Sequence, residues 1–494
     1  MSIIVIILGV YMAGNIAIGL YARKRIKSSE DYHLAGRRLG VLMTAGTLAA
    51  TELGGGSSVG VAAKAYGNWG LSAGWYVVAA GIGILLVSFV APAMRRSMAT
   101  TVPEIIGRRY GVSSQTISAA LGCLALVALT AVQITVGATI ISTLSGLSLT
   151  WSILITGVAV IFYTWIGGMW SVTLTDFVHF FVLIGGFAIA VPFAMNAAGG
   201  WGHVVAHLPA GQLGFTKIGW PTIIGLVVLY FMTFSTGQEA VQRYYSARTP
   251  RIAVLGSLLC GGLMVLYAFI PAIMGLIALA VYPGINPNNA LATTAVGLLP
   301  PIIGGLLLSA VMSATLSAAS GDMLGASTIF IKDLYPRFSR GRTLTDKKEL
   351  KFSRYGVLVV GVLATVISLW SQAIIPLLVF AFTMRSAGPF SAYIFSLILK
   401  RTSRMAGLVS IIVGTLAGTV WQIAGEPFGV AAIIFGSVCG LASFVGIHMI
   451  DAKRGRLTGD TSGPDSEHPE SRTTQESAVT AGSSVEVTSG TANQ

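Results

Sequence analysis

Charged residues are scarce in this chain of 494 residues. Asp, Glu, Lys and Arg together make up 10% of it, whereas 54% is apolar. A soluble domain carries about 25% charged residues, so too few charges are present to cover a surface that faces water. Cysteine is also rare, and Cys123, Cys260 and Cys439 all fall in apolar stretches, which indicates neither a disulfide framework nor a metal-binding spacing. The shortage of charge excludes a soluble globular protein and makes lipid the natural solvent of most of the chain.

The formal net charge of +13 does not indicate nucleic-acid binding. The basic residues occur in short clusters between apolar stretches of spanning length, not on one soluble face. The first apolar stretch is followed by Arg23, Lys24 and Arg25, whereas a secretory signal has its charges first. We therefore expect residues 2–22 to be a transmembrane helix.

The apolar stretches predict an all-α membrane protein with about thirteen transmembrane helices. Each stretch is near or above the roughly 20 residues that a helix needs to cross the hydrocarbon core. A β-barrel is not indicated, because its strands would be alternating segments of about ten residues. The expected spans are residues 2–22, 41–67, 70–91, 114–144, 149–168, 174–197, 219–236, 251–282, 297–330, 354–372, 373–399, 404–424 and 428–450.

The distribution of Lys and Arg predicts the orientation. Basic residues mark the cytoplasmic loops of membrane proteins. With the N-terminus outside, nearly all of them fall in loops on the inside; Lys64 and Lys217 fall outside, and Arg385 lies within a span. We expect a multi-pass protein of the cell membrane with its C-terminus in the cytoplasm.

The C-terminal segment, residues 457–494, is rich in Ser, Thr, Gly and Glu and has no aromatic residue. Such a segment cannot bury enough apolar surface to offset its ordering entropy. It is predicted to be a disordered cytoplasmic tail. Because no output domain follows the spans, a membrane sensor is not favoured.

Two spans carry small polar interruptions. The second span contains three consecutive glycines, Gly54, Gly55 and Gly56, beside Glu52, and the seventh contains residues 233–237, Thr-Phe-Ser-Thr-Gly. Broken helices in lipid are tolerated where they line a cavity, and paired breaks in two halves point to an inverted-repeat transporter. We expect residues 41–197 and 219–399 to be the two five-helix repeats, with residues 1–22 and 404–450 peripheral to them.

Five short stretches resemble the sodium:solute symporter family, and the resemblance runs over nearly all of residues 1–450. They are Asp31-Tyr32-His33-Leu34-Ala35-Gly36-Arg37; Thr101-Val102-Pro103-Glu104-Ile105 with Arg109-Tyr110; Tyr163-Thr164 with Gly167-Gly168-Met169 and Thr175-Asp176; Gln242-Arg243-Tyr244; and Ser327-Thr328-Ile329-Phe330 with Asp333-Leu334-Tyr335. Thr101 and Glu104 also have the spacing of a helix capping box, and Thr175-Asp176 suits a helix start. The resemblance implies a LeuT-type fold and sodium-coupled symport of a small organic solute, with sodium as the coupling ion and no other cofactor.

The resemblance also implies a sodium site where the break of the second span meets the ninth. Its ligands would be the carbonyl oxygens of Ala50, Leu53 and Ala314 and the hydroxyl of Ser317. Many relatives have a second hydroxyl at the position of Ala318, and Ser313 or Ser320 is the alternative source of that hydroxyl. Unwound carbonyls and hydroxyls suit a hard cation.

The substrate site is expected around the same breaks. The implied residues come from both interrupted spans and from the third and eleventh. They are Glu52, Gly54, Gly55, Gly56, Ser57, Trp75, Tyr76, Tyr230, Thr233, Phe234, Ala381 and Arg385.

Glu52 and Arg385 are predicted to lie at the same depth. Glu52 is about 17 Å from the cytoplasmic face and Arg385 about 18 Å from the outer face at 1.5 Å per residue. Because an isolated charge at mid-membrane is costly, we expect the two side chains to pair in at least one transport state. The alternatives are that Arg385 meets a substrate carboxylate or bonds carbonyls of a neighbouring helix, and that Glu52 attracts the cation directly.

The sequence predicts a symporter and leaves its substrate and oligomeric state open. Partners are membrane lipid, sodium and a small organic solute such as an amino acid, carboxylate or vitamin. The alternative with the same fold couples to a proton carried by Glu52. A membrane-embedded enzyme is the alternative from another class, and scattered histidines such as His179 give it no cluster to use.

Overall fold

The computed structural model describes residues 2–24, 26–339, 344–371 and 374–459, and these residues are almost entirely helical. The first half of the chain contains α1 (Ser2–Arg23), α2 (Ser29–Leu34), α3 (Val41–Glu52), α4 (Val61–Lys64), α5 (Trp75–Val87), α6 (Ala91–Arg96), α7 (Val102–Tyr110), α8 (Val112–Ser145), α9 (Leu149–Ala197) and α10 (Gly200–His207). The second half contains α11 (Trp220–Thr236), α12 (Gln238–Ser246), α13 (Pro250–Tyr267), α14 (Ile270–Val281), α15 (Ala290–Gly297), α16 (Pro301–Ile329), α17 (Tyr335–Phe338), α18 (Asp346–Trp370), α19 (Ile374–Ser386), α20 (Pro389–Ile398), β1 (Arg401–Thr402), α21 (Arg404–Ile423), α22 (Ala432–Lys453) and β2 (Thr458–Gly459).

Ten helices in the described residues are long and apolar enough to cross a membrane, or eleven if the bent pair of α11 and α12 counts as one span. The expected all-α membrane fold is confirmed, but the count of thirteen spans is not. Two predicted spans account for the difference. The apolar part of α1, Gly9–Ala22, is shorter than a full span, and the predicted second span is divided between the short helix α3 and a segment continuous with α5.

The predicted break in the second span is present. Helix α3 ends at Glu52, Leu53 and Gly54 form a bend, and the chain resumes as a π-helical turn over Gly56–Gly60. The bend brings the backbone into close contact with α8 and α16. A Cβ atom on Gly55 would lie 2.4 Å from Val136 and 2.7 Å from Thr315, so only glycine fits there.

The second predicted break lies at Gly237, where α11 and α12 meet at an angle of 59°. A Cβ atom at Gly237 would lie 2.6 Å from a carboxylate oxygen of Glu239 and 2.8 Å from the Arg385 guanidinium. Glycine therefore allows two charged side chains to approach the backbone of the break.

Helix α9 joins what the sequence predicts as two spans, residues 149–168 and 174–197. The two parts meet at a kink at Gly168, whose φ of 50° and ψ of −159° are accessible to glycine. The ring of Tyr32 occupies the place that a side chain would take there. Thr175 and Asp176 consequently lie inside the helix, and the prediction of a helix start at these residues is wrong. The Thr101 N-cap of the predicted capping box is confirmed, because its hydroxyl accepts a hydrogen bond of 3.1 Å from the backbone N–H of Glu104 at the start of α7. The Glu104 carboxylate accepts from the backbone N–H of Thr100, one residue before the N-cap.

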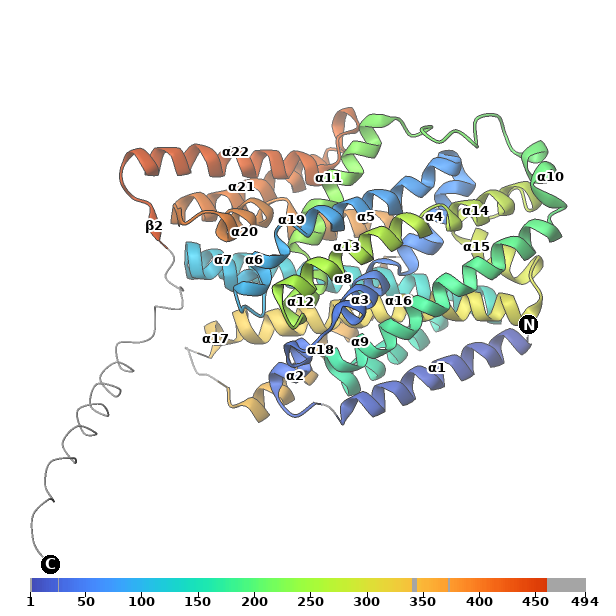
Figure 1. Ribbon diagram of the computed structural model, residues 1–494, viewed down its shortest axis with the longest axis horizontal. Coiled ribbons are helices and arrows are strands. Elements are labelled where there is room, and N and C mark those ends of the chain that lie inside the picture. Colours follow the sequence, from blue (N-terminus) through green and yellow to red (C-terminus); the bar gives the residue numbers. More distant parts are fainter. Residues whose placement is uncertain (1, 25, 340–343, 372–373, 460–494) are drawn as a thin grey trace, which may run out of the picture.

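Helix α16 lies at the centre of the bundle, beside α8, α9, α1 and α18. In the most apolar 18-residue stretch of the span that contains α16, 83% is buried inside the protein. In the corresponding stretch of α22, at the edge of the bundle, 28% is buried (Figure 1). Gly, Ala and Ser dominate the sequence of α16, which allows neighbouring helices to approach closely.

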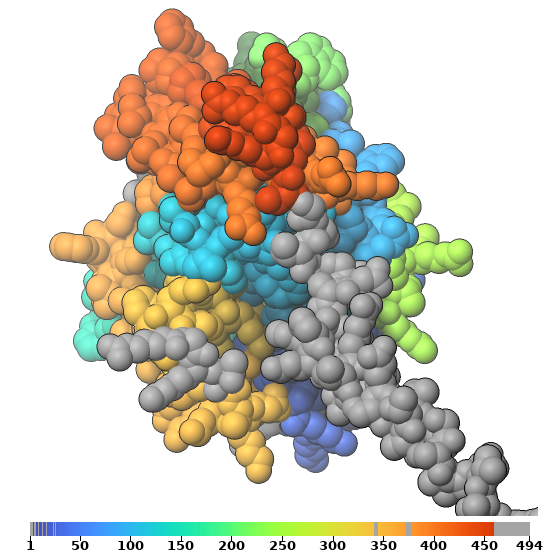
Figure 2. Space-filling view, turned by 90° about the vertical axis from the view of Figure 1, so that its left-hand side faces the viewer, coloured from blue at the N-terminus to red at the C-terminus, as the bar shows by residue number. Residues whose placement is uncertain are grey.

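The short elements α2, α7 and α17 lie at the same end of the molecule as β2, and α10 and the N-terminus lie at the other end (Figure 1). Figure 2 looks onto the first end, where segments from the early, middle and late parts of the chain meet. These short elements belong to the loops that the basic residues mark as cytoplasmic. Thr458 and Gly459 pair with β1, so they are part of the fold, and the rest of the predicted tail, residues 460–494, lies outside the described residues.

Candidate binding sites for ion and solute

A small cavity of about 70 Å³ lies between the two helix breaks. Thr51, Glu52, Gly54, Gly56 and Ser57 line it from the first break, and Tyr230 and Glu239 line it from either side of the second. Helices α5, α8, α13, α16 and α19 complete the wall.

Three carboxylates and one guanidinium line this cavity: Glu52, Glu239, Asp322 and Arg385. Arg385 forms an ion pair with Glu239, and both side chains are about 95% buried. The predicted pairing of Arg385 with Glu52 is therefore absent from this conformation. The reason is the bend at Gly237, which brings Glu239 of α12 to α19. Glu52 faces the same cavity, and its Oε1 atom has no hydrogen-bond partner among the described residues.

Aromatic rings form another side of the cavity. Tyr76 and Tyr230 line it, and their rings meet edge to face with centroids 5.3 Å apart. Phe234 packs behind Tyr230 with ring centroids 5.2 Å apart and is buried away from the lining. Trp75 lies outside the site, because its indole N–H donates to the Phe215 carbonyl and its ring packs against Trp220. The expectation that Trp75 faces the substrate is not met in this conformation.

Some of the remaining predicted substrate residues line the cavity, and others are buried behind the lining residues. Ser57 lines the cavity and donates a hydrogen bond of 3.1 Å to the Gly54 carbonyl. Gly55, Thr233 and Ala381 are buried beside the cavity and do not line it. On α19 the residues that line the cavity are Leu378, Phe382 and Arg385.

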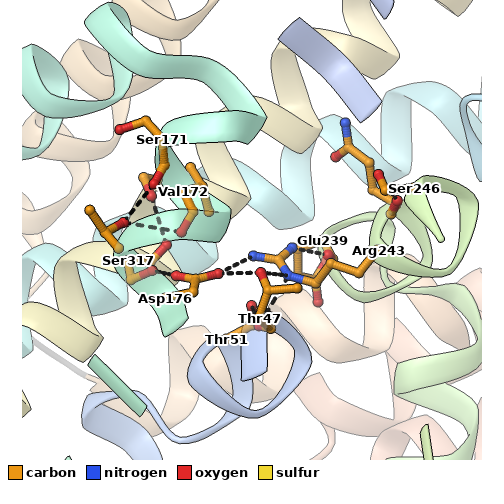
Figure 3. Close-up of polar contacts among 12 residues, drawn as sticks. Thr47, Thr51, Ser171, Val172, Asp176, Glu239, Arg243, Ser246 and Ser317 are labelled. Carbon is orange, nitrogen blue, oxygen red and sulfur yellow. Dashed lines mark hydrogen bonds and ion pairs between the residues drawn. The ribbon is translucent and has the colours of Figure 1, made fainter. Parts of the chain in front are cut away.

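A second polar cluster lies behind the first break and is centred on Asp176 of α9 (Figure 3). The hydroxyls of Thr47 and Ser317 both donate to the Asp176 carboxylate. The Arg243 guanidinium lies 3.3 Å from the same carboxylate and 3.2 Å from the Thr47 carbonyl. All four side chains are buried, so the cluster joins α3, α9, α12 and α16 through a fully desolvated ion pair.

The predicted sodium ligands lie beside this cluster. Ala50, Leu53, Ala314 and Ser317 are all buried where α3 meets α16. The position of a Cβ atom on Gly54 would be 3.7 Å from the Ala314 carbonyl oxygen and 3.3 Å from Ala318, so the break packs directly on this part of α16. The structure thus brings the predicted ligand residues into one region.

The two alternative serines differ in position. Ser313 faces away from the break, since it accepts a hydrogen bond of 2.9 Å from Asn15 of α1 and lines a separate pocket with His179. Ser320 donates to the Ser317 carbonyl within its own helix. Ser313 is therefore unsuited to replace the hydroxyl missing at Ala318.

Seven polar residues of the two sites are missing from the sequence-based prediction of site residues: Thr47, Thr51, Gln133, Asp176, Glu239, Arg243 and Asp322. The signal that could have revealed the carboxylates is their position, because ionisable side chains within spans are rare and usually functional. Helix α16 has Asp322 as its one acidic residue, eight residues beyond Ala314.

The fold matches that of sodium-coupled carriers. The model of the sodium:solute symporter family matches residues 32–414, and this chain belongs to that family. It is 26% identical to the osmoregulated proline transporter OpuE of Bacillus subtilis over 476 residues, which is 90% of this chain and 94% of the relative. It is 27% identical to a sodium/proline symporter of Staphylococcus aureus over 87% of this chain and 88% of the relative.

Solved structures show the same fold. A substrate-bound, outward-open sodium-coupled sialic acid symporter superposes with a TM-score of 0.78 at 20% identity, over 91% of this chain and 98% of the other. Mhp1, a nucleobase-cation-symport-1 family transporter, superposes with a TM-score of 0.56 at 17% identity, over 85% of this chain and 95% of the other. The fold is thus the LeuT type. The protein is a multi-pass membrane transporter, not an enzyme, and couples symport of a small solute to sodium.

Proposed function

We propose that the coupling sodium binds where the bend after α3 packs on α16. The ligands are the carbonyl oxygens of Ala50, Leu53 and Ala314 and the hydroxyl oxygen of Ser317. Sodium is a hard cation that takes oxygen ligands, and a bend in a helix frees carbonyl groups for it. The observation that carries this proposal is the hydrogen bond from Ser317 to Asp176. Because the Ser317 proton is donated to Asp176, the hydroxyl oxygen keeps its lone pairs for the cation.

Asp176 and Arg243 set the charge around this site. The carboxylate orients the hydroxyls of Ser317 and Thr47 and attracts a cation, while Arg243 compensates its charge when no cation is bound. A buried carboxylate without a partner would be strongly destabilising, so the guanidinium allows the site to exist without sodium.

The cavity between the two breaks is the substrate site of this proposal. It lies next to the proposed sodium site because Thr51, Glu52 and Gly54 line it from the same bend that carries Ala50 and Leu53. Sodium bound at the bend stabilises the geometry of these lining residues, so that sodium and solute bind cooperatively. Movement of one helix group against the other then exposes both to the opposite side.

We also propose the orientation and the repeat boundaries. The end of the bundle with α2, α7 and α17 faces the cytoplasm of the cell membrane, because these elements carry most of the basic loops. Residues 41–197 and 219–399 form the inverted repeats, each opening with a broken helix.

Ion-driven uptake into proteoliposomes tests the coupling. The full-length protein is reconstituted, and a low-molecular-weight filtrate of yeast extract is added outside as the source of solutes. Uptake of radioactive sodium that depends on the filtrate is the expected result. Sodium uptake that the filtrate does not change would contradict the proposal.

Glu52 gives the proton-coupled alternative its one supporting observation, since its Oε1 atom faces the cavity without a hydrogen-bond partner among the described residues. The same proteoliposomes loaded with a pH-sensitive dye distinguish the two. Acidification of the lumen when filtrate is added in sodium-free buffer would favour a proton carried by Glu52. An unchanged luminal pH supports sodium.

A further inference from the structure

We infer that the solute carried through this cavity is a small organic cation with N–H donors, of the amine, amidine or guanidine kind. This inference rests on the proposed assignment of the cavity as the substrate site. It follows from the acidic side chains of the lining, from the hydrogen-bond acceptors that have no partner there, and from the ion pair that Arg385, the one basic side chain of the lining, forms with Glu239.

The charge of the lining is negative. Glu52, Glu239 and Asp322 contribute three carboxylates and Arg385 one guanidinium. Arg385 and Glu239 compensate each other in their ion pair, whereas Glu52 and Asp322 form no ion pair within the described part of the chain. When both carboxylates are ionised in the loaded site, two positive charges balance them, and one sodium and one organic monocation supply that number. An anionic solute would instead add to the repulsion.

The open hydrogen-bonding positions are mostly acceptors. Glu52 Oε1, Gln133 Oε1 and Glu239 Oε2 line the cavity and have no partner among the residues described, and Glu239 is 4% exposed. Arg385 Nε is the corresponding open donor. A buried polar atom without a protein partner calls for another one, such as water, an ion or a ligand. A group with several N–H donors fits three open acceptors, whereas a carboxylate fits none of them.

The charge of Arg385 is already compensated by Glu239. Its Nη1 atom is held by Glu239, and its guanidinium lies over the Phe382 ring at 4.9 Å. A substrate carboxylate at the open Nε atom would share one guanidinium with Glu239 and add a negative charge beside Glu52 and Asp322, which is costly in a buried site. Arg385 thus positions Glu239 at the cavity.

The rest of the lining fits the carbon skeleton of such a cation. Leu129, Met264 and Leu378 give apolar contacts, and Tyr76 and Tyr230 give aromatic ones. Rings beside carboxylates favour a cation, because the face of an aromatic ring attracts positive charge.

Sodium is the other source of positive charge near Glu52. Asp322 separates the two sources, because it lies five residues beyond Ser317, the nearest proposed sodium ligand on α16, or about 7.5 Å along the helix. A response that needs Asp322 therefore reports the organic cation, and a response that needs Ser317 reports sodium.

The experiment separates the yeast-extract filtrate by ion exchange at pH 7 into cationic, net neutral and anionic fractions. Each fraction is added to the purified full-length protein in saturating NaCl, with KCl of equal conductivity as the control, and the midpoint of thermal unfolding is measured. The cationic fraction is expected to raise the midpoint. A rise with the anionic or net neutral fraction alone, or no rise with the cationic one, overturns the inference.

Two variants complete the test. Asp322→Asn is expected to weaken half-maximal stabilisation by the cationic fraction about ten- to hundredfold, the effect of losing one charged hydrogen bond. Asp333→Asn is the matched control, because Asp333 is equally buried but bonds Gln115 outside the cavity. An unchanged cation response in well-folded Asp322→Asn overturns the inference. Stabilisation by sodium alone is measured in parallel, and its absence in the parent protein counts against the proposed sodium site, not against the substrate class.

Discussion

Ser317 has two roles in the proposed site: its proton goes to Asp176 and its oxygen goes to the cation. Removing the hydroxyl with Ser317→Ala takes one ligand from sodium and leaves Asp176 with Thr47 and Arg243. We expect the sodium concentration for half-maximal solute uptake to rise about tenfold, corresponding to loss of one interaction of about 1.4 kcal/mol. Uptake measured against sodium concentration at constant solute checks this.

Ser313→Ala is the control for this prediction, because Ser313 bonds Asn15 on the opposite side of α16. Its sodium dependence should match that of the parent protein. Equal shifts in both variants would mean that Ser317 acts through packing of α16.

Arg385 and Glu239 form an ion pair whose members are almost completely buried. Removing one partner leaves a buried charge uncompensated at a cost of about 3–5 kcal/mol, so Arg385→Gln and Glu239→Gln should each lower the unfolding midpoint strongly. The double variant should be more stable than the sum of the single effects predicts.

A double-mutant cycle that combines Glu52→Gln with Arg385→Gln serves as the comparison. Glu52 does not contact Arg385 in this structure, so its coupling to Arg385 should be smaller than that of Glu239. A larger coupling energy with Arg385 for Glu52 than for Glu239 would support the pairing of Glu52 with Arg385 that their depth in the membrane predicts.

At the scale of elements, the bend after α3 depends on close packing of its glycines. A methyl group at Gly55 would overlap Val136 and Thr315, whereas one at Gly56 has nothing within 4 Å. Gly55→Ala should therefore lower the unfolding midpoint by the equivalent of about 1–3 kcal/mol, the usual cost of overpacking, and Gly56→Ala should not. Equal midpoints for the two variants would contradict this packing.

Helix α2 is held to the bundle by His33, whose ring nitrogens lie 2.8 Å from the Thr328 hydroxyl and 3.1 Å from the Ser353 hydroxyl. Burial, together with nearby Lys332, lowers the pKa of His33 to about 3. The unfolded chain has a His pKa near 6.5, so the stability from neutral His33 is complete above that pH and is lost as the pH falls below it.

We therefore expect the unfolding free energy to drop by about 2 kcal/mol from this group between pH 6.5 and pH 5. Thermal unfolding at pH 7.5 and pH 5 checks this in the parent and in His33→Asn, where this part of the pH dependence should disappear. His203→Asn, at an exposed histidine, is the control and should retain the full dependence.

The sequence predicted the two helix breaks because glycine and small polar residues interrupt apolar stretches at Gly54–Gly56 and Gly237. It did not predict what the breaks bring together. The partner of Arg385 depends on a 59° bend that moves Glu239 toward α19, and depth along straight helices cannot show that. Asp176 was missed for a related reason: its partners come from α3, α12 and α16, and only their packing makes one cluster of them.

For the whole molecule, the proposed orientation predicts which ends react from outside the cell. Thr216 lies in the exposed segment after α10, and Lys347 lies in the exposed start of α18 at the opposite end. In intact cells a membrane-impermeant maleimide should label Thr216→Cys, and it should label Lys347→Cys only after permeabilisation. The reverse pattern would invert the orientation; the parent protein, with its three native cysteines, gives the background.

The negative lining of the cavity determines where membrane voltage acts in the transport cycle. When the carrier holds one sodium and one organic cation, the two cations neutralise Glu52 and Asp322. The loaded carrier then changes between its two states with little net charge. After release the two carboxylates are left without their cations, and each one that stays ionised gains at most about 2.3 kcal/mol per 100 mV, the value for a negative charge that moves outward across the whole membrane. The voltage therefore drives the return of the unloaded carrier, so that a polarised cell resets the carrier quickly and a depolarised cell slows it at that step.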